Sequence, residues 1–175
     1  MGNLDFIKKL YNGKNCYSDH MSDEELELIH IHSKVEDMIL ELLESGKIVF
    51  LTGNPGDGKT FLIKRQLEKI KALNTYIETD LNRVANYEEV ANKLVECYEK
   101  ETPAIVAVNE YQFYQLCKIM KRINNNIYTE TMNVKKDCII YDIPNVSIKR
   151  IVIVDLNERS LLDKDRALTE EVIDK

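Results

Sequence analysis

The sequence lacks any long apolar segment. Hydrophobic residues make up 44% of its 175 residues, but no run of them approaches the roughly 18 residues that a membrane-spanning helix needs. The first residues, MGNLDFIKKLYNG, contain no apolar stretch of the kind found in signal peptides. These absences predict a cytoplasmic protein that does not enter a membrane. The length corresponds to a single domain of ordinary size.

Closely spaced cysteines are also missing. The four cysteines are Cys16, Cys97, Cys117 and Cys138. No two of them have the CxxC spacing of a metal or redox site, and isolated cysteines of this kind are most often small buried side chains. His30 and His32 form an HxH pair, but residues two apart on a helix point to different faces. We therefore expect no metal site built from cysteine or histidine.

The chain has fewer basic than acidic residues. Lysine and arginine number 24 against 30 acidic residues, which gives a net charge of −6 and argues against a generally basic nucleic-acid-binding protein. The charge is uneven, however, because basic residues outnumber acidic ones between residues 118 and 150. Such a stretch is usually ordinary solvated surface. DNA remains a candidate partner, which would bind through residues 118–150.

Short apolar runs alternate with helical patterns along the chain. The expected strands are residues 47–52, 75–79, 104–110 and 150–156. The expected helices are residues 22–45, 59–73, 87–100, 111–123 and 168–175. The strand runs are rich in isoleucine and valine without polar alternation, which predicts an α/β fold with a parallel sheet covered by helices on both faces.

The remaining segments are less regular. Ser22 and Glu25 form a capping box at the start of the first long helix, so residues 1–21 are taken as a segment that precedes a domain over residues 22–175. Residues 1–20 are expected to hold a short helix and a loop. Residues 123–147 are polar and rich in turn formers, and we expect a hairpin around residues 138–143.

Glycine is scarce too, yet three of the six glycines lie in the stretch GNPGDGKT, residues 53–60. This matches the phosphate-binding P-loop pattern GxxxxGK[ST], with an apolar strand before it and a helical pattern after it. The glycines let successive N–H groups face one anion, Lys59 can reach the β- and γ-phosphates, and the Thr60 hydroxyl suits Mg²⁺. We expect ATP and Mg²⁺ as cofactors. The expected nucleotide-binding residues are Gly53, Asn54, Pro55, Gly56, Asp57, Gly58, Lys59, Thr60 and Phe61.

Asn109 and Glu110 follow the third apolar run, where a parallel sheet opens its binding crevice. In one interpretation Glu110 is the general base that polarises the attacking water, and Asn109 accepts a hydrogen bond from a water bound to Mg²⁺. In the other, Asn109 caps the next helix and Glu110 lies in its favourable first turn. The first is favoured because this strand ends where the site must be.

The fourth apolar run ends in DLNER. Asp155 is a candidate Mg²⁺ carboxylate, Asn157 a candidate catalytic residue that reads the γ-phosphate, and Arg159 a candidate phosphate contact. Polar residues after a strand are common on any surface, so each of these roles has an ordinary structural alternative. Asp80, at the end of the second run, is expected to cap the following turn.

Together, GNPGDGKT, AIVAVNE and IVIVDLNER resemble the nucleotide-binding core of the AAA-type and related ASCE P-loop NTPases, over about residues 22–160. The resemblance implies a three-layer P-loop NTPase fold. It also implies that Asn109 stands where the Walker B strand normally has Asp, and that Asn157 holds the sensor 1 position. The GDGK loop and the Asn-Glu strand are also similar to ATPases of bacterial DNA-restriction and phage-defence systems, including the phosphorothioation-dependent restriction ATPases.

These patterns predict an ATPase that drives or switches a partner, which can be another protein, a second copy of the chain or DNA. A nucleotide-binding switch with little turnover is the first alternative, because the Walker B-like Asp is missing and no helical lid is evident after Arg159. A small-molecule kinase is the second. Such kinases carry an arginine-rich lid, and few arginines lie between the third and fourth strands.

Overall fold

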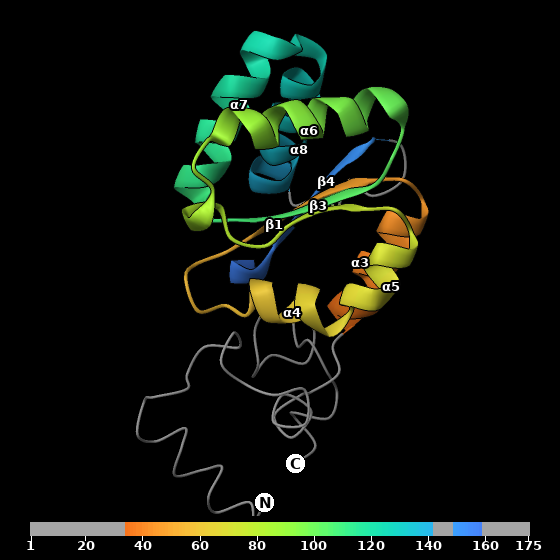
Figure 1. The fold of residues 1–175 in the computed structure, drawn as a ribbon. Helices are drawn as coiled ribbons and strands as arrows, with labels where there is room; N and C mark the ends of the chain where they lie inside the picture. Colours follow the sequence, from red (N-terminus) through yellow and green to blue (C-terminus); the bar gives the residue numbers. More distant parts are fainter. Residues whose placement is uncertain (1–33, 142–148, 159–175) are drawn as a thin grey trace, which may run out of the picture.

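The computed structural model describes residues 34–141 and 149–158. Within these ranges four strands form one sheet in the order β2-β3-β1-β4, and all neighbouring strands run parallel (Figure 1). The strands are β1 (Ile48–Thr52), β2 (Tyr76–Glu78), β3 (Ala104–Val108) and β4 (Ile151–Asp155). The predicted α/β class with a parallel sheet is confirmed.

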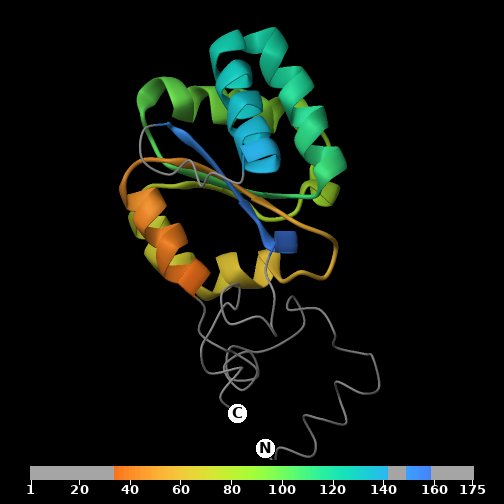
Figure 2. The ribbon, with the colours of Figure 1, turned by 180° about the vertical axis from the view of Figure 1, so that it is seen from behind.

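Helices lie on both faces of the sheet, as Figures 1 and 2 show from opposite sides. One face is covered by α6 (Tyr87–Lys100), α7 (Glu110–Ile123) and α8 (Asn125–Tyr141). The other is covered by α3 (Lys34–Glu44), α4 (Lys59–Arg65) and α5 (Leu67–Ala72). Short 3-10 helices, η2 (Leu81–Arg83) and η3 (Leu156–Glu158), follow β2 and β4.

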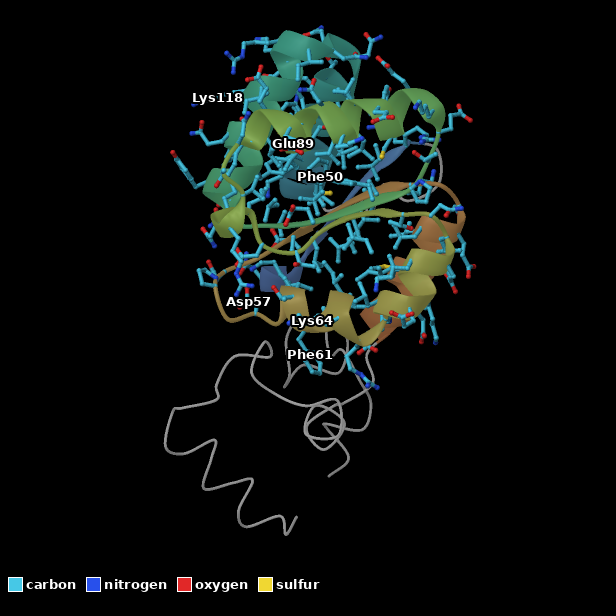
Figure 3. All side chains as sticks on the ribbon, in the orientation of Figure 1. Phe50, Asp57, Phe61, Lys64, Glu89 and Lys118 are labelled. Carbon is cyan, nitrogen blue, oxygen red and sulfur yellow. The ribbon has the colours of Figure 1, made fainter. Side chains whose placement is uncertain are left out.

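The central strand β1 explains why the strand sequences show no polar alternation. Ile48 and Phe50 pack into the core beneath α6, α7 and α8, whereas Val49 and Leu51 pack into the core against α3, α4 and α5. Every residue of β1 is buried, as parallel strands between two helical layers must be. Phe50 lies inside the first of these cores, and its ring meets that of Phe113 edge to face at 5.3 Å (Figure 3).

The stretch after residue 123 folds as helix α8, so the expectation of a turn-rich segment with a hairpin around residues 138–143 is wrong. The helix continues through Cys138 to residue 141. Its buried side chains recur at helical spacing: Ile127, Thr131, Val134 and Lys135. Two of these four are polar, which hid the apolar stripe that normally marks an amphipathic helix.

Several element boundaries also differ from those expected. Helix α6 has the expected limits. Strand β3 ends at Val108, two residues early, because Asn109 already caps the next helix. The helix after the glycine-rich loop is divided at Gln66, whose N–H donates to the Ile63 carbonyl three residues back at 3.2 Å.

Other expectations concern residues outside the described ranges. They are the helix at 1–20, Cys16, the capping box of Ser22 and Glu25, the pair His30 and His32, Arg159, and the closing helix at 168–175.

Two of the cysteines are buried core side chains, as expected. Cys97 of α6 and Cys117 of α7 both belong to the core between these helices and the sheet. Burial raises the pKa of Cys117 to about 12, so this thiol stays protonated at neutral pH and is a poor nucleophile. Cys138 on α8 is partly buried, and burial raises its pKa as well.

None of the helices in the described ranges combines the length and apolar character that crossing a membrane requires. The longest is α8, with 17 residues, and it contains several charged side chains.

Candidate nucleotide-binding site

The site lies at the carboxyl edge of the sheet, where three parallel strands end side by side. In the register of the sheet, Thr52 of β1 lies between Val108 of β3 and Asp155 of β4. The glycine-rich loop leaves β1 immediately after Thr52. The residues that follow β3 and β4 therefore flank the loop on both sides.

The loop takes a backbone shape that its glycines permit. Gly53, Gly56 and Gly58 all have positive φ, at 152°, 95° and 83°, a region that side chains other than glycine rarely adopt. A Cβ on Gly53 would lie only 2.7 Å from the Asp57 Oδ2 atom. Gly58 precedes α4 without a side-chain cap, so no capping side chain occupies the first N–H groups of that helix.

Lys59 folds back across the loop in the structure. Its Nζ donates to the carbonyl oxygen of Gly53 at 2.9 Å and to that of Asn54 at 2.7 Å. The backbone N–H of Asn54 donates to the Asp57 carboxylate, so Asp57 stabilises the turn of the loop. Phe61 is half-buried and lies on the side of α4 that faces away from the sheet (Figure 3).

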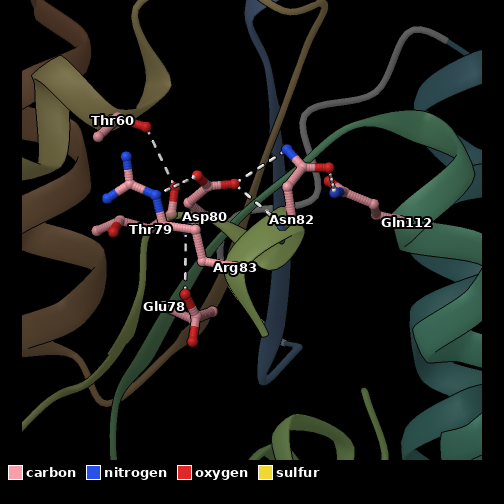
Figure 4. Close-up of polar contacts among 7 residues, drawn as sticks. All are labelled: Thr60, Glu78, Thr79, Asp80, Asn82, Arg83 and Gln112. Carbon is pink, nitrogen blue, oxygen red and sulfur yellow. Dashed lines mark hydrogen bonds and ion pairs between the residues drawn. The ribbon is translucent and has the colours of Figure 1, made fainter. Parts of the chain in front are cut away.

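Thr60 connects the loop to the end of β2. Its Oγ1 donates to the Thr79 carbonyl oxygen at 3.1 Å (Figure 4). Asp80, the next residue, caps η2 by accepting from the Asn82 N–H at 3.0 Å and forms an ion pair with Arg83 at 3.2 Å. The predicted capping role of Asp80 is thus confirmed.

The same group of contacts reaches the start of α7. Gln112 donates from Nε2 to the Asn82 Oδ1 atom at 2.9 Å (Figure 4). Gln112 and Asn109 also form a reciprocal capping box, with bonds of 2.9 and 3.0 Å. The structure thus gives Asn109 the helix-capping role of the second interpretation, and Glu110 is the first residue of α7.

We expect Asn109→Ala to lower the free energy of unfolding by about 1 kcal/mol, the usual effect of losing an N-cap side chain. Urea denaturation followed by circular dichroism measures this. Asn86→Ala is the matched control, because Asn86 caps α6 through the Glu88 N–H at 2.9 Å. An Asn109→Ala protein as stable as the wild type would contradict the capping role.

On the other side of the loop, η3 contacts it directly. Asn157 donates from its backbone N–H and from Nδ2 to the Asp155 Oδ1 atom at 3.0 and 2.9 Å. Its own Oδ1 accepts from the Asn54 side chain at 2.6 Å. Asn157 thus lies beside the loop and holds the Asp155 carboxylate.

Lys135 of α8 links Asp155 to Glu110. Its Nζ lies 3.7 Å from the Asp155 Oδ2 atom and 3.9 Å from the Glu110 Oε1 atom. The Lys135 side chain is only 9% exposed, against 26% for Asp155 and 71% for Glu110. Asp155 and Glu110, which the sequence analysis predicted as site residues, therefore both lie near Lys135.

Lys135 was counted only as part of a basic surface stretch at the sequence level. The helical recurrence of Ile127, Val134 and Lys135 was the signal that could have found it. That signal is weak because Thr131 and Lys135 occupy two of the buried positions. Lys118 of the same basic stretch is exposed on the outer side of α7 (Figure 3).

Comparisons with protein-family models, with curated proteins and with solved structures found no match. The residues of the site are therefore the basis for assigning a function. They combine a glycine-shaped loop, a lysine that lies across it, a hydroxyl and two carboxylates at one edge of the sheet. Such a set can bind a phosphate chain and a hard divalent cation.

Proposed function

We propose that the chain is a P-loop NTPase that binds ATP with Mg²⁺ and hydrolyses it to drive or switch a partner. The observation that carries the proposal is the loop between β1 and α4. There, three positive-φ glycines shape the backbone, and Lys59 lies across it. A buried strand enters this loop and a helix leaves it, which is the context that the motif demands.

Each group has a distinct role in this proposal. The loop N–H groups and Lys59 would hold the phosphates, and Thr60 would ligate Mg²⁺ through its hydroxyl oxygen. Asp155 would supply the carboxylate for hydrated Mg²⁺, and Asn109, which follows β3, adds no charge to the site. Glu110 accepts the proton of the attacking water. Thr60 and Asp155 would hold Mg²⁺, which would supply positive charge against the negative charge that develops in the reaction.

Asp155→Asn is expected to weaken Mg²⁺-dependent ATP binding while leaving metal-free nucleotide binding nearly intact. A hydrated dication beside phosphates is usually held by at least one carboxylate, and Asn109 cannot supply one. Calorimetric titrations with Mg²⁺ and with a chelator measure the difference.

Adding Asn109→Asp in the same protein should recover part of the loss, because aspartate is also a good N-cap and returns a carboxylate to the edge. Equal effects of Asp155→Asn with and without Mg²⁺ would exclude Asp155 as the metal carboxylate.

The proposal is tested on the wild-type protein by ATP titration and by phosphate release, with and without DNA. Tight binding with turnover supports the ATPase, and turnover that rises with DNA identifies DNA as a partner. Tight binding without turnover in any condition supports the nucleotide-binding switch instead. Absence of ATP binding contradicts both.

A small-molecule kinase is the second candidate. Strand β1 pairs directly with β3 and has β4 on its other side, so Glu110 follows the strand next to the loop, where a carboxylate can also take the proton of an acceptor hydroxyl. A screen of small hydroxylated acceptors for ATP-dependent phosphorylation separates this function from hydrolysis.

A further inference from the structure

We infer that Lys135 is the residue through which the site distinguishes a nucleoside triphosphate from a diphosphate. The inference rests on the proposed nucleotide binding and adds to it a residue outside the P-loop and the strand ends.

Lys135 is an unusual side chain for its position. It projects from the long helix α8 and is 9% exposed, and its Nζ lies 5.9 Å from the centre of the Phe113 ring. Burying an ammonium group costs free energy unless other groups compensate its charge and its hydrogen-bond donors. The groups that surround the Lys135 ammonium therefore bear on the role of this side chain.

Two acids balance the charge of Lys135, but its N–H groups donate no hydrogen bond to them. The nearest carboxylate oxygens, on Asp155 and Glu110, lie at 3.7 and 3.9 Å, which is beyond the usual hydrogen-bond distance of about 3.2 Å. No hydrogen bond from Nζ is found in residues 34–141 and 149–158. The ammonium therefore lies between two acids without a hydrogen bond to either.

A buried hydroxyl without a hydrogen-bond partner lies at the same edge. Thr52, the last residue of β1, is 3% exposed, and its Oγ1 has no hydrogen-bond partner among the described residues. Strand alternation puts Thr52 on the same face as Phe50, the face covered by α7 and α8, and Asp155 is its partner in register. A buried hydroxyl without a partner is rare in native proteins, so the Thr52 Oγ1 beside the P-loop indicates a place for an acceptor-rich group.

The local charge indicates which group this is. Without nucleotide, the acids Asp155 and Glu110 share one cation, Lys135, and the cluster carries one net negative charge. In the proposed complex Asp155 would turn to hydrated Mg²⁺ and Glu110 to the attacking water, which would free Lys135 to meet the most distal phosphate. Thr52, which Gly53 of the loop follows directly, is the register partner of Asp155, so Lys135 contacts the edge from which the loop leaves. A diphosphate lacks the group that Lys135 would contact.

The test measures dissociation constants for a non-hydrolysable ATP analogue and for ADP, both with Mg²⁺, by calorimetry. Lys135→Met keeps the length of the side chain and removes its charge. We expect it to weaken analogue binding about tenfold, the effect of losing one charge-assisted hydrogen bond, and to change ADP binding less than about twofold. Lys136→Met is the matched control, because Lys136 is the exposed neighbour on the same helix, and it should change neither.

Lys135→Gln provides a second neutral variant should the methionine protein not fold, and Lys135→Arg should retain the preference for the triphosphate. A folded neutral variant with the wild-type ratio of the two constants overturns the inference, and so does an equal loss for both nucleotides. If the wild type binds neither nucleotide, the proposed function and this inference both fail. If the wild type binds both and only the ratio is insensitive to Lys135, this inference alone fails.

Discussion

Lys59→Ala should bind ATP and Mg²⁺ at least about tenfold more weakly than the wild type, a loss of about 1.4 kcal/mol or more. In the proposed complex, Lys59 is the side chain of the loop that contacts the phosphates. In the structure its Nζ donates to the carbonyl oxygens of Gly53 and Asn54. Exchange of these neutral acceptors for charged phosphate oxygens gives shorter and stronger hydrogen bonds. Alanine removes that gain and leaves the loop backbone in place.

Lys69→Ala is the matched control for this result, because Lys69 is an exposed lysine on the neighbouring helix α5. It should bind ATP as the wild type does. Calorimetric titration of both variants, with circular dichroism to show that they are folded, gives the comparison. Wild-type affinity in a folded Lys59→Ala protein would show that the loop does not bind the phosphate chain.

In the parts of the fold that the sequence predicted well, several features of the sequence indicate the same element. Strand β1 is a fully apolar run, and α6 has an N-cap, a buried stripe and the expected limits. The glycines of the loop must occupy unusual backbone regions, and few residue types can replace them. In each case several local preferences agree, which is why a single sequence suffices.

Helix α8 shows why other parts could not be predicted. Its inner face includes Thr131, whose hydroxyl donates to the Ile127 carbonyl oxygen at 2.7 Å, and Lys135, whose charge is balanced by acids on other elements. Both are stable there only because of partners that a pattern of hydrophobicity does not contain. The order of the strands is equally hidden, since all four runs look alike and pairing is decided between distant segments.

The structure also shows how the candidate residues depend on one another. Thr60 is connected through the turn at Asp80 to the capping box of α7 (Figure 4). Asn54 is connected through Asn157 to Asp155. The loop is therefore attached to the elements that follow both β2 and β4.

Glu110→Gln is expected to leave ATP binding nearly unchanged and to reduce turnover by about 10² to 10⁴, the usual contribution of a general base. Glutamine keeps the length and hydrogen-bonding reach of the side chain but cannot take the proton of the attacking water. Folding should be little affected, because the Glu110 side chain is 71% exposed and its ion pair with Lys135 is loose, at 3.9 Å. Single-turnover phosphate release, measured beside calorimetric binding, separates the two effects.

Glu88→Gln is the control for this variant, because Glu88 is an exposed glutamate in the first turn of α6, a position similar to that of Glu110 in α7. Loss of a first-turn charge near a helix N-terminus is common to both changes, so any difference in turnover belongs to the position of Glu110 at the site. Hydrolysis at the wild-type rate in Glu110→Gln would remove Glu110 as the base. The proton would then have to pass to Asp155, the other carboxylate that contacts Lys135, and Asp155→Asn would become the variant that abolishes turnover.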